Sequence, residues 1–298
     1  MKPRTSPVSK MNPIGVNNAA SFQPVTASLA PGEDIALYGT GLSSVTMSIQ
    51  GGQVFPTTGL GGVTVTINGI SCPLYSVSPG QINAVVPYEV ASNPTGLANI
   101  QVTNNGGQSN VVQVYTTDAS PGSFSQTQNG IGFAAALHAA TNQLITTDNP
   151  AEPGEYISLY LTGLGPVSPA ITDGAVGPSN PLSYADLFPN SLTVNFNDYN
   201  PTNGSTGNAG NIQFAGLVPT LAGLYQINVQ VPTSGLGAGD NVYVEFITDA
   251  ADVKQIQIPV GFGSSDRPTA AARRRARLAV IRARRDRIPR RVANPAAR

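Results

Sequence analysis

The sequence predicts an all-β protein made of two antiparallel β-sandwiches in tandem, and three observations lead to that prediction. Its 298 residues suffice for two domains, and they include 32 Gly and 25 Pro, no Trp and only 11% charged residues. Such a composition is typical of many short strands separated by turns. Apolar residues alternate along most of the chain, and one phrase, PGEDIALYGTGL at 31–42, returns as PGEYISLYLTGL at 153–164.

The repeated phrase belongs to a longer duplication. VTVTIN at 63–68 matches LTVNFN at 192–197, and GQINAVVP at 80–87 matches YQINVQVP at 225–232. The order of the matches is kept while their offset grows from 122 to 129 and then to 145 positions. Because surface loops tolerate insertions, we infer two copies of one folding unit, the second with longer loops.

Each expected strand has apolar residues at every second position, which places one of its faces in a core. Turn-forming pairs such as Gly61-Gly62, Asn93-Pro94 and Asn200-Pro201 separate the strands. Short strands at this spacing favour an antiparallel sandwich. In chain order, the apolar sets that mark the strands are Ile35–Leu37, Val63–Ile67, Ile82–Val86, Ala98–Val102, Ile157–Leu159, Val194–Phe196, Ile227–Val231 and Val242–Phe246.

We divide the chain into four parts on this basis. Residues 1–13 are expected to be a disordered N-terminus, 14–117 the first sandwich, 118–262 the second sandwich and 263–298 a disordered, Arg-rich tail. The boundary between the sandwiches falls on the polar, turn-forming segment that begins at Asp118, as domain boundaries usually do. Since this segment is short, we expect the sandwiches to lie end to end with restricted freedom.

The motifs of the first unit lead to a family resemblance. PGEDIALYGTGL, VTVTINGISCPLYSVSPGQINAVVP and ANIQVTNNGGQSN follow one another as in the immunoglobulin-like IPT/TIG module, which this unit resembles. With GVNNAASF, SPGSF, YISLYLTGLGPV and AGLVPTLAGLYQINVQVP added, residues 15–262 resemble an uncharacterised C-terminal domain family first described from Solibacter proteins. The resemblance implies immunoglobulin-like sandwiches in a secreted or surface-exposed bacterial module, usually at the end of a longer protein, with no known activity and no catalytic residues.

Charge is distributed unevenly along the chain. Residues 11–265 contain one basic side chain, Lys254, and fourteen acidic ones, a net charge of −13, whereas residues 266–298 contain twelve Arg and two Asp, a net charge of +10. Nucleic-acid affinity comes largely from Lys and Arg that replace counterions, so only the tail offers such a contact. The tail is either a disordered basic arm for RNA, DNA or anionic lipid, or a solvated segment that can reflect a shifted reading frame.

The sequence predicts neither a catalytic nor a cofactor site. His138 is the only histidine, so one chain holds no two-His metal site, and no G-x-S-x-G motif accompanies it. We expect His138 to be a strand or edge residue that opens the second sandwich. Cys72, the only cysteine, is expected to be a small, half-buried apolar residue rather than a reactive thiol, since no His or basic residue lies near it in the sequence.

The loop FNDYNPTNGSTGNAGN at 196–211 is a weak calcium candidate. Its oxygen ligands include Asp198, Asn200 and Asn203, and calcium accepts such oxygens. Only one of them is a carboxylate, whereas calcium loops normally carry several, so a solvated insertion is favoured and no metal site is predicted. TTDNPAEPGE at 146–155 is a second weak candidate, whose prolines indicate turns before the next strand.

The duplication also repeats glycines and amides at fixed places. They are Gly41 and Gly163 in the turns that close the repeated phrase, and Gln81, Asn83, Gln226 and Asn228 on either side of a core isoleucine. In a strand the amides face away from the core. We favour a structural role, in which they bond the backbone of a neighbouring strand or loop, over a duplicated ligand site.

The functional prediction is correspondingly broad. No segment reaches the ~18 to 20 apolar residues that span a bilayer, and no apolar signal-peptide core is visible near the N-terminus. We expect a non-enzymatic extracellular or cell-surface module for binding, adhesion or structure, whose partner is an unidentified protein or carbohydrate. Two alternatives stay open: an accessory region of a secreted carbohydrate-active enzyme, and a DNA-binding IPT/TIG-like protein that uses its basic tail.

Overall fold

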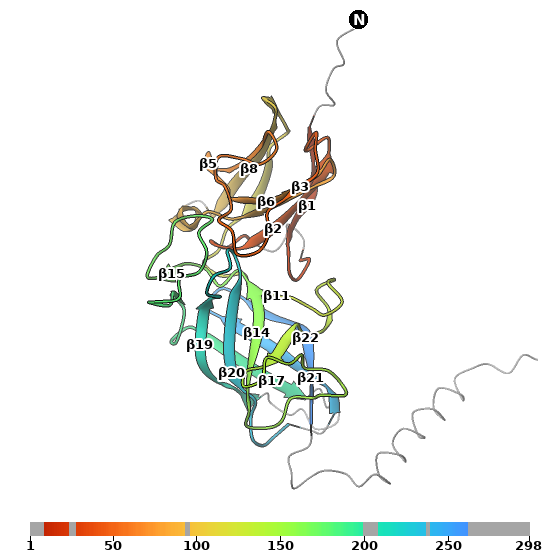
Figure 1. Ribbon diagram of the computed structural model, residues 1–298, viewed down its shortest axis with the longest axis vertical. Helices are drawn as coiled ribbons and strands as arrows, with labels where there is room; N and C mark the ends of the chain where they lie inside the picture. Colours follow the sequence, from red (N-terminus) through yellow and green to blue (C-terminus); the bar gives the residue numbers. More distant parts are fainter. Residues whose placement is uncertain (1–8, 24–27, 93–95, 199–207, 237–238, 262–298) are drawn as a thin grey trace, which may run out of the picture.

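A computed structural model describes residues 9–23, 28–92, 96–198, 208–236 and 239–261. These residues form β-strands joined by turns, with one short 3-10 helix, η1, at Tyr88–Ser92. The strands build two β-sandwiches that lie end to end along the long axis of the molecule, red to yellow for the first and green to blue for the second in Figure 1. The predicted all-β fold with two sandwiches is confirmed.

The first sandwich consists of two antiparallel sheets. One has the strand order β1-β2-β7-β6-β3 and the other β10-β8-β4-β5, with β9 paired to β8. The strands are β1 (Lys10–Asn18), β2 (Asp34–Thr40), β3 (Met47–Ser48), β4 (Val63–Ile67), β5 (Ile70–Ser71), β6 (Leu74–Val77), β7 (Gln81–Val85), β8 (Leu97–Asn104), β9 (Gly107–Gln108) and β10 (Val112–Tyr115).

The second sandwich repeats this plan with longer connections. One sheet has the order β11-β14-β20-β19-β16-β15, with β13 paired to β14, and the other has the order β12-β22-β21-β17-β18, in which only the β12–β22 pair is parallel. The strands are β11 (Gly122–Ser123), β12 (Gly132–Phe133), β13 (Ala136–His138), β14 (Tyr156–Thr162), β15 (Val167–Ser168), β16 (Tyr184–Ala185), β17 (Leu192–Asp198), β18 (Asn208–Ala209), β19 (Asn211–Leu217), β20 (Tyr225–Gln230), β21 (Gly239–Thr248) and β22 (Asp252–Val260).

The alternating apolar residues fill the two cores, as the period of two predicts. Val63, Val65 and Ile67 of β4 are buried while the threonines between them stay partly exposed. They pack against residues of the facing sheet, including Ile35 and Ile82. The second core contains the matching set from β14, β17, β20 and β21. Burial of these side chains is the main stabilising contribution to each sandwich.

Strand β1 begins earlier than the sequence suggests. Residues 1–13 were expected to be disordered, but Lys10 pairs with Thr40 and Met11 pairs with Gly39 of β2. The Met11 side chain is almost fully buried, and its backbone N–H donates to Asn110 Oδ1 at 2.9 Å. Pro13 and an irregular register between Met11 and Val16 interrupt the period of two, which is why the alternation did not reveal this end of the strand.

The repeated phrase forms the same turn in both sandwiches. The Glu33 side chain accepts the Ala30 N–H at 2.7 Å, and the Glu155 side chain accepts the Glu152 N–H at 2.9 Å. Gly32 and Gly154 have φ of +68° and +89°, a left-handed conformation that favours glycine. Each Pro-Gly-Glu turn is therefore closed by its own glutamate before β2 or β14 begins.

The turn of the first copy packs against the end of the repeated phrase in the second copy. The Asp34 N–H donates to Oγ1 of the fully buried Thr162 at 2.7 Å, and Glu33 lies beside Gly163. Further along the joint, the Phe55 N–H donates to the Gly174 carbonyl at 2.9 Å. An apolar cluster of Phe55, Val85 and Ala222 fills the space between the sandwiches. This contact region, the joint, holds the two sandwiches end to end.

Tyr225 lies at the centre of the joint. Its ring is fully buried, and its hydroxyl donates to the Gly165 carbonyl at 2.6 Å and lies 3.3 Å from the Tyr88 hydroxyl of the first sandwich. A Cβ atom on Gly32 would collide with the Tyr225 hydroxyl and would lie 2.7 Å from Cε1 of Tyr88. A Cβ atom on Gly154 would meet only Thr233 Cγ2, at 3.2 Å.

The variants Gly32→Ala and Gly154→Ala test whether the joint stabilises the fold. Both place alanine at positive φ, which lowers the free energy of unfolding by about 1 to 2 kcal/mol. The free energy of unfolding of Gly32→Ala should be lowered further, because its methyl group also displaces Tyr225 and Tyr88. Urea unfolding followed by circular dichroism measures the difference. Equal losses in the two variants would contradict a tightly packed joint.

Candidate functional site

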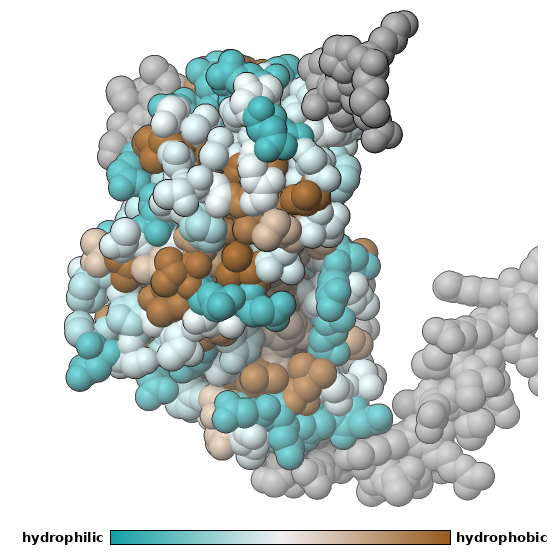
Figure 2. Space-filling view, turned by 45° about the horizontal axis from the view of Figure 1, so that its top comes forward, coloured by the Kyte–Doolittle hydropathy of each residue, from teal (hydrophilic) through white to brown (hydrophobic). Residues whose placement is uncertain are grey.

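A cleft of about 350 Å³ lies beside the joint, and both sandwiches line it. Its lining residues are small, aromatic or neutral and polar: Ala19, Ala20, Phe22, Ala36, Tyr38, Tyr75, Gln81, Asn83, Phe124, Ser125 and Gln128. The face drawn in Figure 2 carries much apolar surface in its middle band, with smaller apolar areas above and below it among polar residues. A volume in the range of ~300 to 1,000 Å³ is typical of small-molecule sites, so this cleft is the candidate functional site.

Two neighbouring strands form the floor of the cleft. Tyr38 of β2 lies directly opposite Gln81 of β7, and Ala36 lies directly opposite Asn83. All four side chains point away from the core, because the residues between them, such as Leu37 and Ile82, are buried inside the sandwich. We call Ala36, Tyr38, Gln81 and Asn83 the floor.

The amides of the floor bond each other. Gln81 Nε2 donates to Asn83 Oδ1 at 2.8 Å, whereas bonds to the backbone of a neighbouring strand or loop were expected from the sequence. Within the described part of the chain, Gln81 Oε1 and Asn83 Nδ2 have no hydrogen-bond partner in the protein. Asn83 Oδ1 accepts one hydrogen bond and keeps a second lone pair, since an amide oxygen has two. The floor thus offers both donors and acceptors to a ligand.

The second sandwich supplies one wall of the cleft. Phe124 and Ser125 follow β11, and Gln128 lies in the turn after them. The Ser125 hydroxyl accepts the N–H groups of Asn129 and Gly130 at 3.2 and 3.0 Å, which fixes this turn. Gly130 lies so close to the first sandwich that a Cβ atom on it would collide with the Ser21 carbonyl. The wall is therefore held against the first sandwich.

Asn18 connects the cleft to the joint. Its Oδ1 accepts the N–H groups of Ala20 and Ser21 at 3.0 and 2.9 Å, which shapes the turn that brings Ala20 and Phe22 to the cleft. Its Nδ2 donates to Glu33 Oε1 at 2.9 Å in the joint. Asn18 is buried, so both halves of its amide are used inside the protein. The position of the cleft lining consequently depends on the joint.

The second sandwich carries a matching set of residues on β14 and β20. Tyr160 lies opposite Gln226, and Ser158 lies opposite Asn228. Gln226 Nε2 donates to Asn228 Oδ1 at 2.6 Å, as in the first copy. Ser158 stands where the first copy has Ala36, and its hydroxyl also donates to Asn228 Oδ1, at 2.9 Å. Asn228 Oδ1 therefore accepts two hydrogen bonds within the protein, whereas Asn83 Oδ1 accepts only the one from Gln81.

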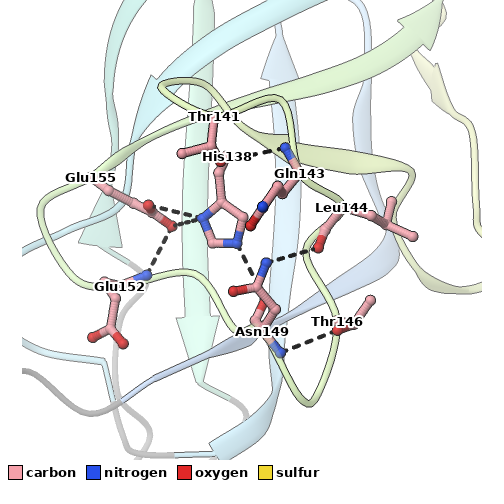
Figure 3. A network of polar contacts seen from close by, with 8 residues as sticks. All are labelled: His138, Thr141, Gln143, Leu144, Thr146, Asn149, Glu152 and Glu155. Atoms are coloured by element: carbon pink, nitrogen blue, oxygen red, sulfur yellow. Dashed lines mark hydrogen bonds and ion pairs between the residues drawn. The ribbon is translucent and has the colours of Figure 1, made fainter.

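His138 is used to hold a loop rather than to line the cleft (Figure 3). It ends β13, and its Nδ1 lies 2.9 Å from Glu155 Oε1 while Nε2 lies 3.3 Å from the Asn149 carbonyl. Both ring nitrogens are thus occupied, and the ring ties the loop before Asn149 to the turn before β14. In the first sandwich Asn18 contacts Glu33 in the corresponding way. His138 is a strand residue of the second sandwich, in the place that the sequence analysis expected.

The remaining candidates from the sequence are structural or lie outside the described residues. Gly41 and Gly163 have φ of +61° and +79° in the turns that end the repeated phrase. Asp198 ends β17, whereas Asn200 and Asn203 lie outside the described residues, so the calcium candidate stays untested. Among the described residues, no group of three or more His, Cys, Asp and Glu is placed to hold a metal ion.

Cys72 is more deeply buried than the sequence suggested. Only 1% of it is exposed, whereas a half-buried residue was expected. Burial raises the pKa of its thiol, so the thiol stays protonated and behaves as an apolar group. Cys72 belongs to the core of the first sandwich.

The sequence singled out two residues of the cleft, Gln81 and Asn83, but favoured a structural role for them, and it did not indicate the aromatic residues of the lining. Tyr38 and Phe124 stand in motifs that drew attention for other reasons, the repeated phrase and SPGSF. Tyr75 sits where the register of β6 against β7 shifts, so no alternation pattern assigns its face. No signal in the sequence shows that the turn after β11 meets β2 and β7.

Comparison with known families supports the fold of the first sandwich. Residues 20–119, about a third of the chain, match the family model of the IPT/TIG domain. The IPT/TIG resemblance is therefore confirmed for this segment, while the resemblance to the Solibacter-type family stays a prediction. A search of curated proteins finds no match.

Several solved structures are distantly similar. The plexin A4 extracellular region is 10% identical with a TM-score of 0.29, and the alignment covers 88% of this chain and 16% of that one. An auxiliary nutrient binding protein from Bacteroides thetaiotaomicron is 11% identical with a TM-score of 0.23, with 87% and 51% of the two chains covered. Titin Ig tandem domains A164-A165 are 8% identical with a TM-score of 0.20, with 85% and 97% covered. This chain spans about a sixth of the plexin chain, and at these scores no function is carried over.

Three carboxyl groups of the joint have raised pKa values in the folded protein. Burial raises the pKa of Glu33 to about 8, although the Ala30 N–H and Asn18 act against the shift. Burial, and then the charge of Glu33, raises the pKa of Asp34 well above its usual value. Burial raises the pKa of Asp173 to about 6, although the Tyr88 N–H acts against the shift. Folding therefore shifts the protonation equilibrium of each group toward the neutral form.

The folded state accordingly binds more protons than the unfolded state once the pH exceeds the ordinary carboxyl pKa values. The contribution of protonated Glu33 should be fully present below about pH 4.5 and lost as the pH rises through about 8. We expect the free energy of unfolding to fall by roughly a few kcal/mol across that interval. Urea unfolding at a series of pH values measures the slope.

Two matched variants separate this effect from general charge repulsion. Glu33→Gln should flatten the alkaline loss of stability, because it removes the titrating group from the buried turn. Glu155→Gln changes the equivalent, partly exposed turn of the second sandwich and should keep the loss. An unchanged slope in Glu33→Gln would show that Glu33 is ionised in the folded protein.

Proposed function

We propose that the protein is a non-enzymatic binding module that acts outside the cell or at its surface, with the cleft as its binding site. The observation that carries the proposal is that both sandwiches line one cleft of about 350 Å³ with aromatic rings and amides. Such a combination of apolar area and a few oriented polar groups is typical of small-molecule sites. The packed joint sets the cleft in place before a ligand arrives, which lowers the entropic cost of binding.

The chemistry of the lining supports binding rather than catalysis. Metal-independent hydrolysis uses a nucleophile beside a base or a pair of carboxyl groups. The described residues of the lining supply amides, phenols and one serine hydroxyl, but no carboxylate or imidazole. The Ser125 hydroxyl accepts two backbone N–H groups in its own turn. Glu33 is engaged in the joint, and His138 is engaged with Glu155.

The setting outside the cell rests on the sequence resemblance. It suits a free-standing module for adhesion or capture, and equally an accessory region of a secreted carbohydrate-active enzyme. Among the described residues, no helix is long and apolar enough to cross a membrane. The N-terminal segment 1–8 and the tail 262–298 lie outside the described residues.

Mapping small molecules on the isotope-labelled chain tests the cleft as a binding site. A library of neutral, acidic and basic fragments should cause saturable NMR shifts at the backbone amides of Tyr38, Gln81 and Gln128. We expect no such set of shifts around Tyr160 and Gln226. Fragments that bind only elsewhere would contradict the proposal. Hydrolysis of an ester, peptide or glycoside panel that His138→Ala abolishes would contradict its non-enzymatic part.

A salt titration with duplex DNA tests the alternative function. Residues 11–265 have a net charge of −13, so any DNA binding by the full chain should depend on the basic tail. It should weaken steeply with salt and disappear when residues 266–298 are deleted. Fluorescence anisotropy with two unrelated duplexes measures both effects. DNA binding that survives the deletion, or that distinguishes the two sequences, would favour the IPT/TIG-like DNA-binding alternative.

A further inference from the structure

We propose that the cleft binds a neutral carbohydrate, with the open amide pair of the floor as the element that selects it. This inference rests on the proposed binding function of the cleft and names its ligand class. Three features of the described residues carry it: the absence of charged side chains from the lining, the combination of aromatic rings with amides, and the difference between the two copies of the floor.

The charge of the surroundings selects against ions. Among the described residues, no Asp, Glu, Lys, Arg or His lines the cleft, so a charged ligand would lose its hydration without gaining an ion pair. The excess of acidic residues in the segment 11–265 further disfavours anionic ligands such as phosphates and uronic acids. A neutral ligand avoids both costs.

The rings and amides together select a ligand that is apolar on its faces and polar at its edges. Phe22, Tyr38, Tyr75 and Phe124 present aromatic surface, and Phe22 is 38% exposed. A purely apolar ligand would leave Gln81 and Asn83 dehydrated without partners, which is unfavourable. A sugar ring suits both groups, since its C–H faces stack on aromatic rings while its hydroxyls donate to and accept from amides.

Tyr75 also lines the cleft, and its phenol stays protonated under ordinary conditions. Its ring stacks on Phe55 with centroids 5.1 Å apart, which holds it at the edge of the joint. Burial raises its pKa well above the usual value. Tyr75 therefore stays a hydrogen-bond donor across the physiological range.

The second copy of the floor shows what distinguishes the first. Ser158 donates to Asn228 Oδ1 and lies 3.4 Å from Gln226 Nε2, so a hydroxyl of the protein already occupies the amide pair. In the first copy Ala36 provides no hydroxyl and leaves room above Asn83. A hydroxyl of the ligand can then take the place that Ser158 takes in the second sandwich.

Isothermal titration of the full chain with a panel of neutral disaccharides of gluco, galacto, manno and xylo configuration tests the proposal. At least one should bind saturably, whereas the corresponding uronic-acid sugars should bind at least about tenfold more weakly. The double variant Gln81→Ala/Asn83→Ala should bind the neutral sugar at least about tenfold more weakly, as two lost hydrogen bonds imply. The matched variant Gln226→Ala/Asn228→Ala should bind within about twofold of the unchanged chain.

Ala36→Ser provides a second variant that is not expected to disturb the fold, because the second sandwich accommodates serine at the equivalent position. It should weaken sugar binding by about tenfold, since its hydroxyl competes for Asn83. Circular dichroism confirms that each variant is folded. Unchanged binding in Ala36→Ser, or equal losses in the two double variants, would overturn the proposal.

The mapping of fragments described above separates this inference from the proposed function. If fragments of another class bind in the cleft and no neutral sugar does, the carbohydrate inference is wrong while the binding function stands. If no molecule binds in the cleft, both are wrong.

Discussion

The structure depends on one contact, the burial of the first Pro-Gly-Glu turn against the end of β14. The Asp34 N–H donates a hydrogen bond to Thr162 Oγ1, and Asn18 Nδ2 donates one to Glu33 Oε1. A buried carboxyl is tolerated here because it is hydrogen-bonded and because burial favours its neutral form. The contact fixes the sandwiches relative to each other, so that a turn of the second sandwich covers one side of a sheet of the first.

The cleft follows from that arrangement. Each sandwich carries a corresponding set of paired residues on its outer face, but only the set of the first sandwich, the floor, lies under the turn that holds Ser125 and Gln128. The two floors then differ at one position that matters chemically, Ala36 against Ser158. Duplication thus supplies two similar surfaces, and packing between the copies turns one of them into a cleft with open polar groups.

The sequence predicted more of the fold than of the site. Alternation located the central strands, such as β4 and β20, because the side-chain period of a strand is visible along the chain. It failed at Met11, where an irregular register breaks the period, and at Tyr75, which lies at a similar shift. The amides of the floor were singled out because they recur. The hydrogen-bond partner of each amide was not predicted. Two polar side chains on the same face of a strand look alike in the sequence whether or not they bond each other.

By itself, the sequence determined the fold class, the duplication and the neutral character of its repeated amides, because alternation and repeats can be recognised directly in a sequence. Tertiary structure decided which of the two outer faces lines a cleft and which acidic side chains are buried. Glu33 and Glu155 occupy the same place in the same phrase, yet one is buried in the joint and the other is partly exposed beside His138. Their difference arises from what packs against each turn, and packing partners distant in sequence leave no periodic signal in the chain.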